Sequence, residues 1–139
     1  MSTHVWDASA ALKLIVQEPG SAQARAVLSA ASRSIVLDWT AMEVANALRK
    51  RVARGATDKH SARVALHLWR RIALEAERAD DLAALALDLA LDNDHTVYDC
   101  AYIALALLES AILVTADAVQ SRVAGRCGVD VVWIDSAAG

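Results

Sequence analysis

The stretch AILVT at residues 111–115 is the clearest β-strand in this sequence, and the fold prediction starts from it. Its residues are apolar without polar alternation, which is typical of a strand buried on both faces of a parallel sheet. Helical segments are expected on either side of it, over residues 97–109 and 118–126, and another apolar run follows at residues 129–134. Strands that alternate with helices indicate a parallel sheet with helices packed on both faces.

The same alternation extends back to the N-terminus. Short strands are expected at residues 4–6 and 34–37, with a weaker one at 74–78, and the break EPG at residues 18–20 separates the first two helices. The expected helices cover residues 8–16, 21–31 and 40–54, a segment from residue 57 or 58 to 72, and one from residue 80 or 81 to 91. The sequence therefore predicts an α/β fold in a single domain, residues 1–139.

The composition suits a domain that folds without external support. The chain has 139 residues, of which 56% are hydrophobic and 22% charged, so a sizeable core is expected and disorder is excluded. Its longest apolar stretch, residues 101–108, is far shorter than the ~20 residues that a membrane-spanning helix needs. Cys100 and Cys127 lack metal-binding or redox spacing, and the N-terminus does not resemble a signal peptide. These features predict a cytoplasmic protein without a membrane partner.

Charge is distributed unevenly along the chain. The formal net charge is −3, yet residues 49–71 hold eight of the fourteen lysines and arginines. Residues 72–99 hold eight acids against one base, Arg78. A local basic face beside an acidic region can bind a polyanion at one place, although a solvated helix face would have the same composition.

Four acids fall where a parallel sheet places its chemistry. Asp7 directly follows the first strand, and Asp117 lies two residues after Thr115. Glu43 is about one turn into the helix after the second strand, and Asp99 is in the first turn of its helix. Because crossover helices begin at the carboxyl ends of the strands, we expect all four carboxylates on one rim of the sheet.

Carboxylates gathered in this way repel each other unless a cation lies between them. Mg²⁺ and Mn²⁺ prefer oxygen ligands, and a site of this kind activates water for attack on a phosphodiester. The four histidines show no zinc-binding spacing with the cysteines. Each acid also has a purely structural interpretation: Asp7 and Asp117 as helix N-caps, Asp99 as a favourable charge at a helix N-terminus, and Glu43 as the partner of Thr40 in a capping box.

Four sequence blocks resemble those of PIN-domain ribonucleases, and most closely the VapC-type toxins of bacterial toxin–antitoxin pairs. The blocks are VWDASAALK (5–13), MEVANAL (42–48), VYDCAYIALA (97–106) and ILVTAD (112–117). They occur in the order of that family and span nearly the whole chain. Ser121 and Arg122 stand where some relatives carry a further acid, which argues against a larger metal cluster.

The resemblance implies a three-layer α/β/α sandwich with a central parallel sheet of four to five strands. It implies an endoribonuclease that depends on Mg²⁺ or Mn²⁺, in which Asp7, Glu43, Asp99 and Asp117 are the catalytic and metal-binding acids. Ser9, Thr115 and Asn46 match supporting polar positions. The resemblance further implies a homodimer and a cognate antitoxin protein whose tail covers the active site.

The RNA substrate is expected to contact part of the basic region, with Lys13, Arg49 and Arg54 nearest the rim. Two other functions fit the pattern less well. A phosphatase of the haloacid-dehalogenase type would need a second aspartate where Ser9 stands. A catalytically silent binding module with the same fold would not need all four acids.

Overall fold

The structure is a computed structural model that describes residues 2–136. Its strands are β1 (Thr3–Trp6), β2 (Arg33–Leu37), β3 (Glu75–Glu77), β4 (Ile112–Thr115) and β5 (Val131–Trp133). Its helices are α1 (Ala8–Leu12), α2 (Ser21–Ala30), α3 (Thr40–Ala53), α4 (Lys59–Trp69), the 3₁₀ helix η1 (Asp80–Leu82), α5 (Ala83–Asn93), α6 (Val97–Glu109) and α7 (Ala118–Arg126). The predicted alternation of strands and helices is confirmed.

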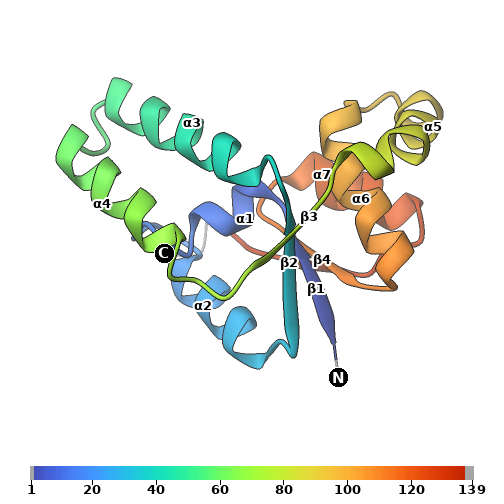
Figure 1. Cartoon of the computed structure of the whole chain (residues 1–139), viewed down its shortest axis with the longest axis horizontal. Coiled ribbons are helices and arrows are strands. Elements are labelled where there is room, and N and C mark those ends of the chain that lie inside the picture. Colours follow the sequence, from blue (N-terminus) through green and yellow to red (C-terminus); the bar gives the residue numbers. More distant parts are fainter. Residues whose placement is uncertain (1, 137–139) are drawn as a thin grey trace.

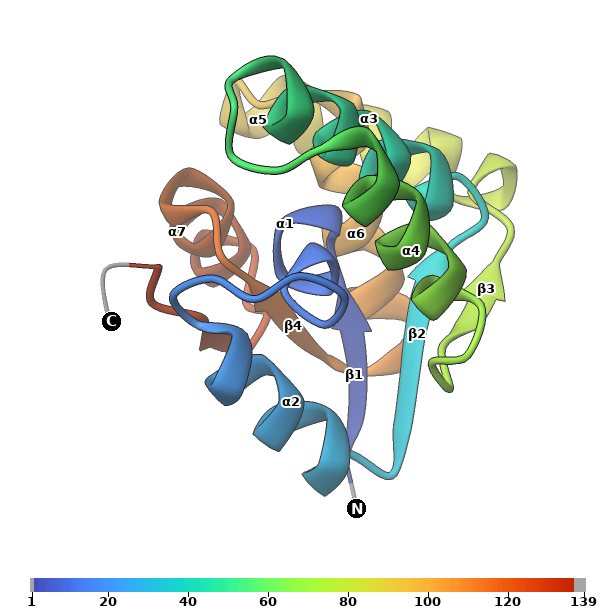
Figure 2. The same ribbon diagram turned by 90° about the vertical axis from the view of Figure 1, so that its left-hand side faces the viewer.

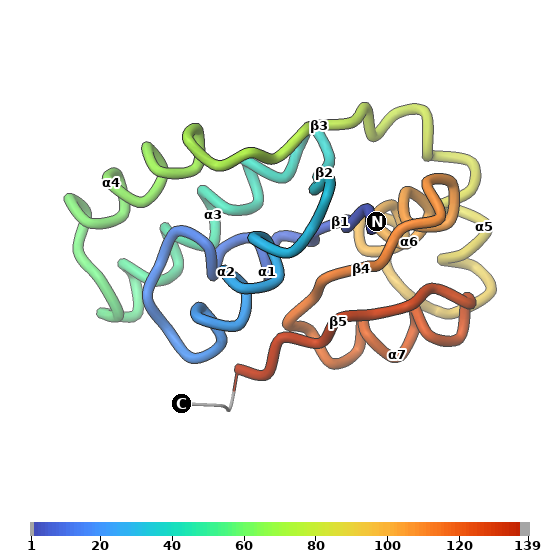
Figure 3. Tube along the Cα trace, turned by 90° about the horizontal axis from the view of Figure 1, so that it is seen from below, coloured from blue at the N-terminus to red at the C-terminus, as the bar shows by residue number. Residues whose placement is uncertain are grey.

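Within residues 2–136 the strands form one five-stranded parallel sheet in the order β3-β2-β1-β4-β5. The Cα trace in Figure 3 follows this order from β3 across the central β1 to β5. The chain builds outward from β1 to β3, and then returns to place β4 on the other side of β1. The strand order therefore reverses between β1 and β4, and open α/β sheets bind ligands outside the carboxyl ends of the strands at such a point.

Two helical layers cover the two faces of the sheet. Helices α1 to α4 lie on one side of it and α5 to α7 on the other (Figure 1). Neighbouring residues of β1 show why both faces need cover, because Val5 packs into the α5–α7 core and Trp6 into the α1–α4 core. In β4, Leu113 likewise packs into the α5–α7 core and Val114 into the α1–α4 core. All four side chains are fully buried. The predicted three-layer sandwich is confirmed.

Some boundaries differ from those expected. Helix α1 ends at Leu12 instead of residue 16, because the next backbone N–H groups of Lys13, Leu14 and Ile15 bond to carbonyls only three residues back. These tight turns lead into Pro19, which cannot continue a helix. The helix expected from residue 80 or 81 begins as the 3₁₀ turn η1 and becomes α-helical at Ala83.

The β5 edge of the sheet is partly covered by a side chain from α2. The amide of Gln23 donates to the carbonyl oxygen of Trp133 at 2.9 Å and accepts from the backbone N–H of Asp135 at 3.3 Å. Gln23 thus makes the bonds that a neighbouring strand would make. Among the described residues, none of the helices has the length and apolar character needed to cross a membrane.

Candidate active site

Asp7 is a buried carboxylate at the switch point. It follows β1 directly, where its backbone N–H donates to the carbonyl of Val114 in β4. The side chain is 4% exposed, and it caps α1 by accepting from the N–H of Ala10 at 3.1 Å. Burial raises the pKa of Asp7 to about 6, although three hydrogen bonds favour its ionised form. The negative charge of Asp99 raises this pKa further, so the two carboxylates repel each other.

Two hydroxyls hold Asp7 and join the ends of β1 and β4. Ser9 donates to Oδ1 of Asp7 at 2.6 Å, and Thr115 donates to Oδ2 at 2.5 Å. Both hydroxyl oxygens also accept hydrogen bonds from the backbone just after β4. Ser9 accepts from the N–H of Ala116, and Thr115 accepts from the N–H of Asp117. The structure thus brings both predicted supporting hydroxyls into contact with Asp7.

Glu43 reaches the site from the first turn of α3. Its Oε1 accepts from the hydroxyl of Tyr102 in α6 at 2.6 Å. Burial raises the pKa of Glu43 above its ordinary value, the Tyr102 hydrogen bond opposes this, and the charge of Asp99 adds to the rise. The alternative interpretation of Glu43 as the partner of Thr40 in a capping box is wrong, because the N-cap of α3 is Trp39 and the hydroxyl of Thr40 accepts from the N–H of Leu37.

Asp99 lies in the first turn of α6, beside a buried glutamine of α7. The N-cap Thr96 donates its hydroxyl hydrogen to Oδ2 of Asp99 at 3.0 Å. Gln120 is fully buried and donates to the backbone carbonyl of Asp99 at 2.8 Å. Its Oε1 lies 2.8 Å from Nε2 of His95, and that same nitrogen is 3.7 Å from Oδ2 of Asp99. Gln120 therefore ties the start of α7 to the start of α6.

Asp117 is the exposed member of the four acids. Its Oδ1 caps α7 by accepting from the N–H groups of Val119 at 2.8 Å and Gln120 at 3.2 Å. Through Gln120 it is connected to Asp99, and through its own N–H to Thr115. Asp117 and Asp7 are thus both helix caps and acids at the rim.

At one edge of the sheet β1 leads into α1 and β2 leads into α3 (Figure 2). The four acids cap or begin the helices that start at this edge. Among the described residues, no lysine or arginine forms an ion pair with any of them. Within residues 2–136, no three or more His, Cys, Asp or Glu side chains are close enough together to hold a metal ion between them. Asp7 and Asp117 turn their oxygens toward protein donors instead. Oxygen donors with unbalanced negative charge are nevertheless the chemistry that suits a hard divalent cation.

Comparison with known proteins agrees with this arrangement. The family model described as PIN domain matches residues 5–126, from β1 to the end of α7. The chain belongs to the PIN-domain family. Ribonuclease VapC3 from Pyrobaculum aerophilum is 40% identical over 115 residues, which cover 81% of this chain and 88% of that relative. The crystal structure of PAE2754 from the same organism has the same fold, with a TM-score of 0.70 at 23% identity over 94% of this chain and 84% of that one.

In the described part of the chain, none of the remaining predicted residues of this PIN domain forms a hydrogen bond or ion pair with the four acids. Lys13 is 4% exposed, and its ammonium group donates to Glu18 at 3.2 Å and to the carbonyl of Pro19 at 2.8 Å. Its charge is balanced inside the fold, so we leave Lys13 out of the proposed RNA-binding surface. Asn46 is exposed on α3 and accepts from Nε of Arg49 at 3.0 Å. Arg49 and Arg54 are exposed.

Sequence reasoning missed the side chains that hold the acids of the PIN domain. Tyr102 lies three residues after Asp99 in α6, a spacing that places both on one helix face and was available in the sequence. Gln120 and His95 carried no such signal, because their roles depend on how α6 and α7 pack. Asp38, directly after β2, is a further acid at this edge; it is exposed and accepts from the N–H of Ala79 at 3.3 Å.

Proposed function

We propose that this chain is a metal-dependent endoribonuclease and the toxin of a toxin–antitoxin pair. The observation that carries the proposal is the negative charge of Asp99 acting on both Asp7 and Glu43, at the switch point of the sheet, without a lysine or arginine ion-paired to any of the three within residues 2–136. Membership of the PIN-domain family supports it, as does the 40% identity to a protein named as a VapC ribonuclease.

Mg²⁺ or Mn²⁺ is the proposed cofactor, with Asp7 and Asp99 as its most direct ligands and Asp117 completing the set. A bound ion of this kind activates a water molecule and stabilises negative charge on a phosphodiester. Glu43 is the proposed group that orients this water or takes its proton. Burial raises the pKa of Glu43 above its ordinary value, which makes this carboxylate a stronger base than an exposed glutamate.

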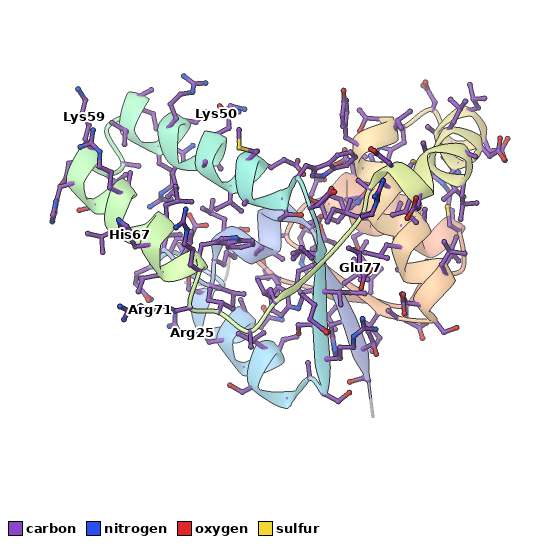
Figure 4. The ribbon with its side chains drawn as sticks, in the orientation of Figure 1. Arg25, Lys50, Lys59, His67, Arg71 and Glu77 are labelled. Atoms are coloured by element: carbon purple, nitrogen blue, oxygen red, sulfur yellow. The ribbon has the colours of Figure 1, made fainter. Side chains whose placement is uncertain are left out.

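A basic surface on α4 is the proposed contact for the RNA backbone. Lys59, Arg63, His67 and Arg70 follow one another along α4 at helical spacing and are all exposed; we call them the α4 stripe. Figure 4 shows Lys59 and His67 on the outer side of α4, with Arg71 just beyond it. The α4 stripe extends over about 16 Å of helix and, with Arg49 and Arg54 of α3, offers positive charge to phosphates.

The groove between α3 and α4 has a different character and suits the proposed antitoxin. This open groove has a volume of about 450 Å³ and is lined by Leu48, Val52 and Leu66 together with the basic residues Arg49 and Arg63. An amphipathic segment with acidic side chains would match both the apolar floor and the basic rim. Ala62→Glu, which adds an acid to this floor, is then expected to weaken the toxin–antitoxin complex measured by calorimetry.

A homodimer remains a prediction. Large apolar side chains stay exposed on α3, α5 and α6, namely Met42, Leu87, Leu91, Val97, Tyr98 and Leu108. A second copy of the chain would bury them. Sedimentation of the purified protein measures whether it is a monomer or a dimer.

Cleavage of RNA by the purified chain, with Mg²⁺ or Mn²⁺ and with EDTA, tests the enzymatic proposal. We expect cleavage with either ion, none with EDTA, and a loss of at least a hundredfold in Asp99→Asn. Asp88→Asn, which removes an exposed acid of α5 outside the site, is the matched control and is expected to keep full activity. A wild-type protein that binds RNA but does not cleave it would be a catalytically silent module.

A further inference from the structure

Tyr102 is a buried residue that links two acids of the site: its hydroxyl contacts Glu43, and it shares α6 with Asp99. Its side chain is 1% exposed, in the α5–α7 core, and it stands one helical turn after Asp99 on α6. Its hydroxyl oxygen is 2.6 Å from Oε1 of Glu43 and 2.7 Å from the hydroxyl of Thr40, one turn before Glu43 on α3. A single phenol thus bridges two side chains of α3 from the helix that carries Asp99.

The donors and acceptors of this contact have only one consistent direction. Thr40 accepts from the N–H of Leu37 at 3.0 Å, at the end of β2. Tyr102 gives its only proton to Glu43, so its oxygen must accept the proton of Thr40. Hydrogen bonds therefore run from Leu37 through Thr40 and Tyr102 to the Glu43 carboxylate. A phenol is protonated at neutral pH, so Tyr102 has a proton to donate.

We propose that Tyr102 is a positioning residue for the reaction: its hydroxyl ties Oε1 of Glu43 to α6, the helix that carries Asp99, so that the carboxylate would be held ready to orient the water of the proposed ion. This inference rests on the proposed function. Thr40 is fully buried and ties the hydroxyl to the end of β2, so the position of Glu43 is set by the sheet and by α6 together. Without the phenol, Glu43 would lose the hydrogen bond that ties its Oε1 to α6.

Tyr102→Phe keeps the buried ring and removes only the hydroxyl. Ser29→Ala is the control, because it also removes one hydroxyl, from an exposed residue of α2 outside the site. Binding of Mn²⁺, measured by electron paramagnetic resonance, is expected to weaken at least fivefold in Tyr102→Phe and to be unchanged in Ser29→Ala. With saturating Mg²⁺, kcat for RNA cleavage is expected to fall at least tenfold while KM changes less than twofold.

A double-mutant cycle separates positioning of Glu43 from general damage to the fold. In a Glu43→Ala background, Tyr102→Phe is expected to cause no further loss of Mn²⁺ affinity, since the carboxylate that Tyr102 positions is gone. An equal loss in both backgrounds, or wild-type Mn²⁺ affinity and kcat in Tyr102→Phe, would overturn the proposal. The Mn²⁺ measurements do not require cleavage, so they distinguish a failure of this inference from a failure of the ribonuclease proposal.

Discussion

Thr115, at the end of β4, donates its hydroxyl hydrogen to Oδ2 of Asp7, at the end of β1, across 108 residues of sequence. The bond spans the two strands between which the sheet reverses its order, and Ser9 adds a second hydroxyl to the same carboxylate. The site is therefore organised around the pairing of β1 with β4. The predictions below test what the acids at this junction do.

Asp7→Asn separates a helix cap from a metal ligand. Asparagine caps helices about as well as aspartate, so α1 is expected to keep its N-terminus. The amide is a neutral, poor ligand for a hard cation, and we expect RNA cleavage to fall at least ~100-fold, equivalent to about 2.7 kcal/mol of transition-state stabilisation. Single-turnover cleavage with saturating Mg²⁺ measures this. Wild-type rates in the variant would show that Asp7 has only a structural role.

The metal-free protein is expected to lose stability as pH rises from about 4 to 7. The pKa of Asp7 is about 6 in the folded chain and near 3.8 when unfolded, so the folded state holds the extra proton between these values. Stability falls wherever the folded state binds more protons, here by up to about 3 kcal/mol for a shift of two pKa units. In urea unfolding with EDTA, the free energy of unfolding of Asp7→Asn should therefore increase relative to that of the wild type as pH rises.

Asp58→Asn is the control for this pH series. Asp58 caps α4 from an exposed position, and hydrogen bonds from Ser61 lower its pKa. Removing its carboxylate should change the pH dependence in the opposite direction. The explanation fails if Asp7→Asn and wild type lose free energy of unfolding in parallel across this range.

Added Mg²⁺ or Mn²⁺ is expected to stabilise the fold. An ion that binds only the folded state contributes about 2.7 kcal/mol at a hundred times its Kd, which for a domain of this size raises Tm on the order of 10 °C. Asp99→Asn should reduce the shift, and Asp88→Asn should retain it. Thermal unfolding across a metal titration measures both, and a flat titration with both ions would contradict the metal site.

Neutralising the α4 stripe is expected to weaken RNA binding and its salt dependence together. Each phosphate contact contributes about 0.7 to the slope of log K against log salt for single strands. Lys59→Ala, Arg63→Ala and Arg70→Ala combined should therefore reduce the slope by about 2. Arg122→Ala with Arg126→Ala, on α7 across the sheet, is the control. Fluorescence anisotropy in EDTA measures binding without cleavage, and an unchanged slope would place the RNA elsewhere.

The three layers of the fold and the placement of the acids at one edge of the sheet could be predicted from the sequence, because both follow from local patterns. Apolar strands such as residues 112–115 identify a parallel sheet, and parallel strands place Asp7 and Asp117 at the same edge. Each acid could be assigned to this edge from its position after a strand or at the start of a helix. The order of the strands could not be predicted, since nothing local specifies that β4 pairs with β1 and not with β3.

Contacts between distant side chains decided what local patterns predicted incorrectly. Thr40 and Glu43 have capping-box spacing, but both turn to the phenol of Tyr102, which offers a buried hydrogen bond that a helix end does not. Lys13 sits in a block that matches the family, yet Glu18 and the carbonyl of Pro19 provide it with an internal site. A sequence shows which residues can form such bonds, and packing determines which of them do.

The hydrogen bond from the amide of Gln23, in α2, to the edge strand β5 limits how a partner protein can bind. The unpaired N–H and C=O groups at the edge of an open sheet can pair with a strand of another chain. Native proteins prevent this with edge strands that are short, charged or covered. Here β5 has its outer carbonyl at Trp133 engaged by Gln23, and β3 is three residues long with glutamates at both ends. Strand addition is thereby disfavoured at either margin, so recognition of this protein is expected to proceed through helical surfaces, and its tendency to form fibrils is expected to be low.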